Sequence, residues 1–157
     1  MRSGIGYDIH RLAEGRGLVL GGVRIEHSRG LVGHSDGDVV LHALMDALLG
    51  AANLGDLGAH FPSADEAHRG ASSLGLLREV GAKVRTARFR ILSLDATVIA
   101  AAPRIAPHVG AMREAIAGAL GLEVGRVSVK ATTNDGLGIV GSGEAIAALA
   151  TALVDGV

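Results

Sequence analysis

The stretch HSDGDVVLHALMDALLG occupies residues 34–50 and combines helix-capping, apolar and ligand-type side chains. Ser35 and Asp36 are residue types that cap a helix N-terminus. Apolar side chains then recur at helical spacing, so we expect a helix over residues 38–50. His42 lies about one turn into this helix, between apolar neighbours.

The segments on either side of this helix alternate between strand and helix patterns. Upstream, residues 2–10 alternate apolar with polar side chains or glycine, as a strand does. The pair Gly21-Gly22 predicts a hairpin turn. In chain order, we expect a hairpin over residues 18–25, a loop over 54–68, a helix over 72–83, a strand over 89–100, a helix from Pro107 to about 120 and a strand over 126–132.

The last segment, residues 143–154, fits two structures. Its alanine and leucine content favours a helix, but its length also fits a central strand buried on both faces. Together the elements predict an α/β (α+β) sandwich. In it, helices cover one face of a mixed sheet of about four main strands, with a small hairpin beside it.

Length and composition bound the class of protein. The 157 residues fit one domain, residues 1–157. Aromatic residues make up only 2% of the chain, so small aliphatic side chains must fill the core. Because each of these buries little area, the composition favours an oligomer that buries more surface between subunits.

Charge and cysteine content exclude several functions. The net charge is -1, and the basic run from Lys83 to Arg90 is interpreted as a solvated loop and strand edge. Without interleaved aromatic residues we expect no nucleic-acid partner. The absence of cysteine excludes disulfides, thiolate catalysis and cysteine-based zinc sites. No stretch is apolar enough for a membrane span or a signal peptide, so we expect no membrane partner and a cytoplasmic location.

Asp8, His10 and His42 are the first candidate ligands. Residues i and i+2 of a strand project from the same face, so Asp8 and His10 present a carboxylate and an imidazole side by side. With His42 they make a three-ligand set of the kind that catalytic zinc takes, leaving one position open. The alternatives are an exposed polar strand and a helix histidine that only packs.

Two further residues of the first stretch have candidate roles. Asp46 lies four residues after His42 and is expected to hydrogen-bond its second ring nitrogen, which orients a metal-bound histidine. His34 lies just before the helix N-terminus, where backbone N–H groups favour a bound phosphate.

Three loop segments carry weaker signals. Residues 129–138, VKATTNDGLG, follow a strand with two hydroxyls and a carboxylate, which suits phosphate oxygens and a hard cation. Glycine-flanked residues 55–58 and small residues 100–106 allow backbone to approach a ligand closely. A polar capping turn, an ordinary loop and tight packing are the alternatives. His27, His60, His68 and His108 show no partner pattern and are interpreted as surface or packing residues.

In this order the segments resemble the 2-C-methyl-D-erythritol 2,4-cyclodiphosphate synthase family over essentially the whole chain. The matching residues are GYDIH at 6–10, GGVRI at 21–25, HSDGD at 34–38, HALMDALLGA at 42–51, GDLG at 55–58, Phe61-Pro62, Ala102-Pro103-Arg104 and VKATT at 129–133.

The resemblance implies metal ligands and stabilising groups. Asp8, His10 and His42 match the zinc ligands. Asp135 stands where the family has a glutamate on a Mg²⁺ or Mn²⁺ ion that bridges the substrate diphosphate. His34 and Thr133 match the residues that stabilise the transition state.

The resemblance also implies the substrate contacts and the assembly. The family is a homotrimer with active sites between subunits, and residues 100–106 receive the cytosine base from the adjacent subunit. Its last segment is a strand, so we assign residues 143–154 to a strand. The implied substrate-binding residues are Ser35, Asp56, Leu57, Gly58, Phe61, Pro62, Ser63, Ala64, Asp65, Ala100, Ala101, Ala102, Pro103, Arg104, Ile105, Ala106, Thr132 and Asn134.

The implied activity is a phosphorus–oxygen lyase reaction of non-mevalonate isoprenoid biosynthesis. It converts 4-diphosphocytidyl-2-C-methyl-D-erythritol 2-phosphate to the 2,4-cyclodiphosphate and CMP. A metal-dependent nucleotide phosphohydrolase and a non-enzymatic metal-binding trimer are the alternatives. This chain departs from the family at Ser63, Asp135 and Gly136, and at Ile139 and Ser142, which replace a phenylalanine and an arginine of a central cavity.

Overall fold

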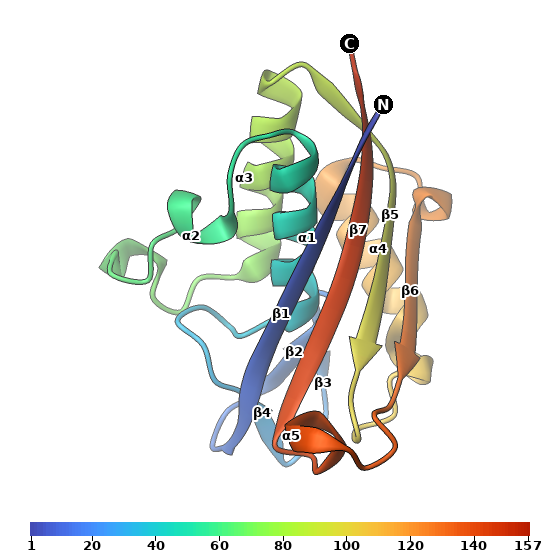
Figure 1. Ribbon diagram of the computed structural model, residues 1–157. Coiled ribbons are helices and arrows are strands. Elements are labelled where there is room, and N and C mark those ends of the chain that lie inside the picture. The colour runs from blue at the N-terminus through green and yellow to red at the C-terminus, as the bar shows by residue number, and fades with distance from the viewer.

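The computed structural model describes residues 1–157 as one mixed sheet with helices packed on one of its faces (Figure 1). The five sheet strands are ordered β4-β1-β7-β5-β6, and β2 and β3 form a separate two-stranded sheet. The strands are β1 (Arg2–Glu14), β2 (Leu18–Leu20), β3 (Val23–Ile25), β4 (Arg29–Leu31), β5 (Phe89–Ile99), β6 (Val127–Thr132) and β7 (Ala145–Gly156).

The long helices lie behind the sheet in Figure 1, whereas α5 (Gly138–Gly141) lies at one end of the opposite face, where Val140 packs with Ala145 and Ala147. The rest of that face carries no helix. The α-helices are α1 (Val39–Ala51), α2 (Leu57–His60), α3 (Ser73–Thr86), α4 (Val109–Leu120) and α5 (Gly138–Gly141). Short 3-10 helices span Glu66–His68, Ala106–His108 and Val124–Arg126. The sandwich, the hairpin and the four main strands β1, β5, β6 and β7 are therefore confirmed. The short edge strand β4 and the one-turn helix α2, which lies in the segment predicted as a loop, are additions that the sequence pattern did not predict.

Strand β1 turns its glycines, not its large apolar side chains, toward the helices. A methyl group on Gly4 or Gly6 would overlap the carbonyl oxygens of Ala47 and Ala43 in α1. On the other face, Ile5 is 68% exposed and Tyr7 is 56% exposed. The glycines thus let α1 lie directly on β1, and Asp8 and His10 follow them on the same face.

The C-terminal segment is confirmed as a strand. β7 pairs antiparallel with both β1 and β5, which places it at the centre of the sheet. Ala148, Ala150 and Ala152 are buried. Pairing on both edges outweighs the helix propensity of alanine, because a central strand satisfies all its backbone groups with its neighbours.

The start of α1 differs from the expected capping. The N-cap is Asp38, whose carboxylate accepts the Leu41 N–H at 3.1 Å. The same carboxylate accepts the N–H groups of Gly21 at 2.9 Å and Gly22 at 2.7 Å. Ser35 and Asp36 do not cap α1, so their side chains bind other groups. Asp38 links the β2–β3 turn to the helix. Both turn glycines have positive φ, as a two-residue hairpin requires.

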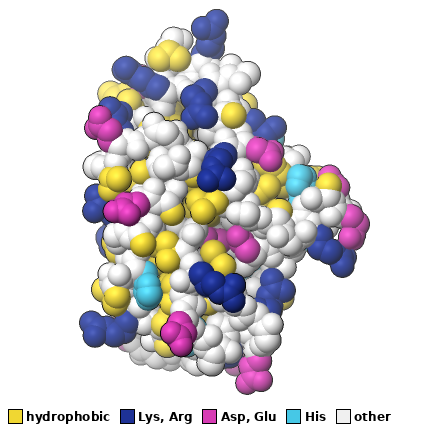
Figure 2. Space-filling model, turned by 180° about the vertical axis from the view of Figure 1, so that it is seen from behind, with side chains coloured by type: hydrophobic (Ala, Val, Ile, Leu, Met, Phe, Trp, Pro, Cys, Tyr) yellow, Lys and Arg dark blue, Asp and Glu magenta, His cyan; other side chains and the backbone are white.

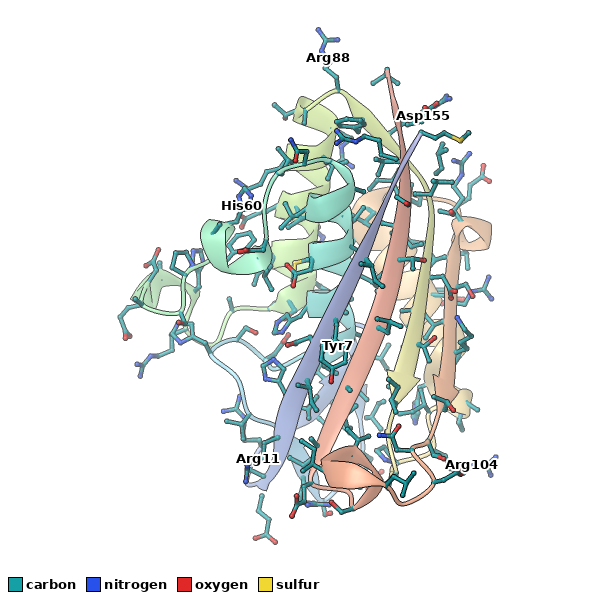
Figure 3. All side chains as sticks on the ribbon, viewed as in Figure 1. Tyr7, Arg11, His60, Arg88, Arg104 and Asp155 are labelled. Atoms are coloured by element: carbon teal, nitrogen blue, oxygen red, sulfur yellow. The ribbon has the colours of Figure 1, made fainter.

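The surface carries charges of both signs. On the helix side, basic and acidic side chains are interspersed (Figure 2). At one end of the molecule, Asp155 binds Arg90 at 2.9 Å and the N-terminal amine at 3.0 Å. Arg88 lies at that same end, and Arg11 and Arg104 lie at the other (Figure 3). No helix combines the length and apolar character needed to cross a membrane.

Candidate metal centre and ligand pockets

Asp8, His10 and His42 meet where α1 crosses β1. Asp8 Oδ2 lies 2.8 Å from His10 Nε2 and 2.9 Å from His42 Nδ1. The two ring nitrogens lie 3.3 Å apart. The three side chains are between 10% and 25% exposed, so the cluster is buried on the protein side and open on one side. The predicted ligand set is therefore brought together in one chain.

The two histidines keep the Asp8 carboxyl ionised. Burial alone would raise the pKa of the Asp8 carboxyl, but hydrogen bonds from His10 and His42 outweigh burial and hold it well below its usual range. The Asp8 carboxylate in turn raises the pKa of His10, against the opposing effect of burial. The second nitrogen of His10, Nδ1, hydrogen-bonds the Val32 carbonyl oxygen. This bond leaves Nε2 of a neutral His10 as a lone-pair donor.

The donor set fits a divalent ion. One oxygen and two nitrogens lie within 4.8 Å of one another. Ligand atoms of a tetrahedral zinc site with bonds of about 2.0–2.2 Å lie roughly 3.3–3.6 Å apart. The observed separations of 2.8, 2.9 and 3.3 Å need only a small expansion to reach this spacing. Three facing donors, two of them nitrogen lone pairs, match a zinc site with one open position.

Asp46 does not orient His42, which corrects the sequence prediction. Its Oδ1 accepts the Leu57 N–H at 2.7 Å and so anchors the loop that begins α2. The second nitrogen of His42, Nε2, lies 3.0 Å from Ser35 Oγ and 3.1 Å from Ser73 Oγ. The i+4 spacing brings Asp46 to the same helix face, but Nε2 faces the start of α3 instead.

The candidate metal cluster of Asp8, His10 and His42 opens into a cavity of about 400 Å³. His34 and Ser35 line it from the approach to α1, and its far wall comes from the loop between α1 and α3. The lining residues are Asp8, His10, His34, Ser35, His42, Leu57, Gly58, Phe61, Ser63, His68 and Leu76. Asp56, Pro62, Ala64 and Asp65 belong to the same loop without lining the cavity. Asp56 caps α2 by accepting the Ala59 N–H at 2.9 Å.

A second pocket of about 200 Å³ lies at the ends of β5 and β6. Its lining residues are Ala100, Ala101, Pro103, Arg104, Ile105, Ala106, Ala131, Thr132 and Thr133. Residues 100–106 and the two threonines, which we interpreted separately from the sequence, thus line one pocket. Thr132, Thr133, Asn134 and Asp135 are all exposed.

The two pockets share no lining residue and lie on different parts of the sheet. β1 carries the metal cluster, whereas the threonines follow β6, and β7 and β5 lie between them. Three strand spacings correspond to roughly 14 Å. A single chain therefore keeps His34 and Thr133 in separate pockets.

Known proteins share both the sequence and this architecture. Residues 1–155 match the family model described as the YgbB family. This chain belongs to the YgbB family. Relatives named 2-C-methyl-D-erythritol 2,4-cyclodiphosphate synthase include one from Symbiobacterium thermophilum, 58% identical over 156 residues, with 99% of both chains covered. Another, from Moorella thermoacetica, is 57% identical, and the match covers 98% of this chain and 94% of the relative.

Solved structures of YgbB relatives superpose along nearly the whole chain. A 2C-methyl-D-erythritol-2,4-cyclodiphosphate synthase in a CDP-bound form has a TM-score of 0.89 at 36% identity, covering 98% of this chain and 100% of that one. The Plasmodium falciparum IspF–CDP complex has a TM-score of 0.86 at 32% identity, covering 99% and 96%. The bifunctional IspDF of Campylobacter jejuni has a TM-score of 0.96 at 40% identity, and this chain spans 42% of its length.

Three residues of this YgbB member join the site without having been predicted. His68 lines the cavity and packs edge-on against Phe61, with ring centroids 5.3 Å apart. Leu76 lines the same cavity from α3, and Ser73 contacts His42. A serine beside an apolar helix pattern and a histidine in a loop carry no periodic signal. The packing of α3 against α1 brings Ser73 and Leu76 to the site, and the segment before α3 brings His68.

The positions that depart from the family pattern are exposed, and Asp135, Gly136, Ile139 and Ser142 lie in or next to the short helix α5. Asp135 adopts a left-handed conformation, with φ of 51°, and its N–H donates to Thr133 Oγ1 at 3.3 Å. Ile139 lines a shallow pocket with Ile9, Arg11 and Glu144. Ser142 donates its hydroxyl to the Ile139 carbonyl oxygen at 3.1 Å. None of these positions takes part in the metal cluster.

Proposed function

We propose that this protein converts 4-diphosphocytidyl-2-C-methyl-D-erythritol 2-phosphate to 2-C-methyl-D-erythritol 2,4-cyclodiphosphate and CMP. The observation that carries this proposal is the three-donor cluster of Asp8, His10 and His42 opening into a cavity sized for a small phosphorylated ligand. The names of the relatives and the CDP complexes of the similar structures support the same substrate class. The reaction makes the protein a phosphorus–oxygen lyase of one catalytic domain, residues 1–157.

Asp8, His10 and His42 are the residues that would hold Zn²⁺. When bound, the ion supplies charge neutralisation to phosphate oxygens. The protein contributes the orientation of each donor: β1 fixes Asp8 and His10 side by side, and α1 fixes His42 opposite them. Asp135 would hold a second, hard ion, Mg²⁺ or Mn²⁺, through its carboxylate.

The chain needs to supply no nucleophile. An oxygen of the substrate's 2-phosphate forms a bond to the β-phosphorus, and the bond between the β-phosphorus and the α–β bridging oxygen breaks, so that CMP leaves with the electron pair. The nucleophile is already anionic. Catalysis therefore consists of positioning and of stabilising charge on the phosphoryl oxygens. His34 and the Thr133 hydroxyl are hydrogen-bond donors suited to the second task.

The proposed active site is shared between subunits of a homotrimer. Support comes from the separation of the two pockets and from the exposure of Thr132 to Asp135 in the single chain. The uncovered sheet face, with exposed Ile5 and Tyr7, is an apolar surface that a trimer would bury. In this arrangement, residues 100–106 of one subunit receive the cytosine while the metal cluster of the next receives the methylerythritol end. A cytoplasmic location stays a prediction.

A phosphorus NMR assay with the proposed substrate, zinc and magnesium tests the reaction. We expect CMP and a cyclic diphosphate to appear only with metal. An open-chain phosphate in place of the cyclic product would instead identify a metal-dependent phosphohydrolase. A metal-loaded protein without any turnover would identify a metal-binding protein without this activity.

Mixing two inactive variants tests the shared site. His42→Ala removes the metal half, and Thr133→Ala removes the threonine half. If each active site takes one half from each of two neighbouring subunits, random remixing of the two variants in a cyclic trimer restores roughly a quarter of wild-type activity. No recovery after confirmed subunit exchange would contradict a shared site.

A further inference from the structure

The second nitrogen of His42 faces a closed polar network. His42 Nε2 lies within hydrogen-bond distance of the hydroxyls of Ser35 and Ser73, at 3.0 and 3.1 Å. Ser73 is fully buried and Ser35 is 9% exposed. A buried hydroxyl costs free energy unless it is hydrogen-bonded. Both buried hydroxyls therefore need hydrogen-bond partners, and His42 Nε2 is one of them.

Ser73 connects His42 to a carboxylate. Its hydroxyl donates to Asp36 Oδ1 at 2.5 Å, and its backbone N–H donates to Asp36 Oδ2 at 2.9 Å. The same Oδ1 also accepts the Asp38 N–H at 3.1 Å, which fixes the carboxylate further. Because the Ser73 proton is committed to Asp36, a lone pair of Ser73 Oγ faces His42 Nε2.

This direction of hydrogen bonding selects one form of His42. A neutral imidazole carries one N–H, and its other nitrogen can bind a metal. Without a metal, Nδ1–H donates to Asp8 Oδ2 at 2.9 Å. An acceptor at Nε2 would keep a proton on that nitrogen once a metal ion replaced the Nδ1 proton, which leaves the Nδ1 lone pair for the metal. We propose that Asp36 and Ser73 act as positioning residues that fix His42 as its Nε2–H tautomer and so present Nδ1 to the metal. The proposal rests on metal binding by Asp8, His10 and His42.

The relay also joins three elements that are distant in the sequence. Asp36 lies in the turn before α1, Ser73 is the first residue of α3, and His42 lies in α1. Carboxylate partners of this kind raise ligand basicity and hold ring orientation, and their loss typically weakens metal binding about 10–100-fold. Asp36, acting through Ser73, therefore has the His42-orienting role that the sequence predicted for Asp46.

Two variants separate positioning from structure. Ser73→Ala deletes the hydroxyl but keeps the backbone N–H bond to Asp36, so the start of α3 keeps its anchor. Asp36→Asn keeps the size of the side chain and weakens the acceptor. Ser72→Ala is the matched control, because Ser72 is the exposed neighbour whose side chain makes no capping bond.

The test measures zinc affinity of the full-length protein by competition with a chromophoric chelator, with thermal melting of the metal-free forms alongside. We expect Ser73→Ala to weaken zinc binding by about 10-fold or more and Asp36→Asn to weaken it in the same direction. Ser72→Ala should bind zinc as the wild type does. In nitrogen-correlated NMR of zinc-loaded wild type, the His42 proton should reside on Nε2.

Two results would overturn the relay. One is Ser73→Ala with wild-type zinc affinity, whether or not its metal-free form melts at lower temperature. The other is a zinc-loaded wild type whose His42 proton resides on Nδ1. Turnover is a separate readout: zinc binding that depends on Ser73 without CMP release would contradict the proposed function and leave the relay intact.

Discussion

The candidate metal cluster is complete within one chain, whereas the pocket at Thr132 and Thr133, called the threonine pocket, is not. Asp8, His10 and His42 are largely buried and bonded to one another and to fixed partners. Thr132, Thr133 and Asp135 are exposed, and the few hydrogen bonds of the two threonine hydroxyls stay within their own turn. The first region is preorganised before any ligand arrives. The second presents polar groups that a substrate and a neighbouring subunit would complete.

Because of this difference, we expect the two regions to affect different quantities, namely metal affinity and turnover. Changes in the first region should alter metal binding, and turnover with it. Changes in the second should alter turnover alone, because its groups make no contact with the metal cluster in the chain. Variants in each region therefore test whether metal affinity and turnover can change independently.

The largest effect is expected from His42→Ala. The variant removes one of three metal donors, so zinc binding should be lost and kcat/KM should fall by about 10³-fold or more, equivalent to about 4 kcal/mol. Chelator competition and the phosphorus NMR assay measure the two quantities. His27→Ala is the control, because the His27 ring lies outside the cavity and its buried Nε2 has no partner to lose. Full zinc binding by His42→Ala would contradict the ligand assignment.

Thr133→Ala should reduce kcat/KM by about 10²–10³-fold, the usual effect of losing one transition-state hydrogen-bond donor. Zinc affinity should stay at the wild-type value. Thr86→Ala, at the exposed end of α3, is the control for removing a threonine hydroxyl. A zinc affinity that fell together with the rate would show that the two regions are coupled within the chain.

Gly6→Ala tests the contact that brings α1 to β1. Because a methyl group there overlaps the Ala43 carbonyl oxygen, we expect unfolding to become easier by about 2–3 kcal/mol. Zinc affinity should fall as well, since His42 would move away from Asp8. Urea unfolding in the presence of EDTA measures the first effect. Gly110→Ala, in α4 with open space around it, should instead stabilise by about 0.5–1 kcal/mol.

The smallest effect is a pH dependence at Asp38. Burial, opposed by hydrogen bonds from backbone N–H groups, raises the pKa of Asp38 to about 6. A folded-state pKa above the unfolded value near 3.8 means that the native state binds the extra proton. This contribution to stability is therefore full below pH 3.8 and is lost as pH rises through about 6.

The free energy of unfolding of metal-free wild type, minus that of Asp38→Asn, isolates this contribution. The difference should increase as pH falls from 7 to 4, by about 1–3 kcal/mol. The Asp8–His10 pair is common to both proteins and cancels. A difference that stays flat over this range would show that Asp38 is ionised in the folded state throughout.

Much of the fold could be predicted because its elements have strong local patterns. The α1 stretch and the strand over residues 89–99 were expected within a residue or two of their observed bounds. The side-by-side placement of Asp8 and His10 could also be predicted, since a carboxylate and an imidazole at i and i+2 of a strand share a face in any fold. Residues 143–154 were a different case: their propensity favoured a helix, and the strand assignment came from resemblance to a family.

Spacing alone misled where partners come from distant segments. The i+4 pattern suggested Asp46 for His42, but the actual partners are Ser35 and Ser73, because α3 packs its N-terminus against that nitrogen. Asp38 caps α1 instead of Ser35 or Asp36, because its carboxylate accepts N–H groups from both the helix and the hairpin turn. Neither choice has a signal within a short window of sequence.

The residue order alone specifies most local elements, the absence of thiol chemistry and the types of donor that the chain can offer to a metal. Which side chains meet depends on how the segments pack in three dimensions. The glycines of β1 illustrate the reason: they form no pattern that predicts burial, but they permit a helix to lie on the strand and bring His42 to Asp8 and His10. Local propensity acts over a few residues, whereas a site depends on close packing between segments far apart in the chain.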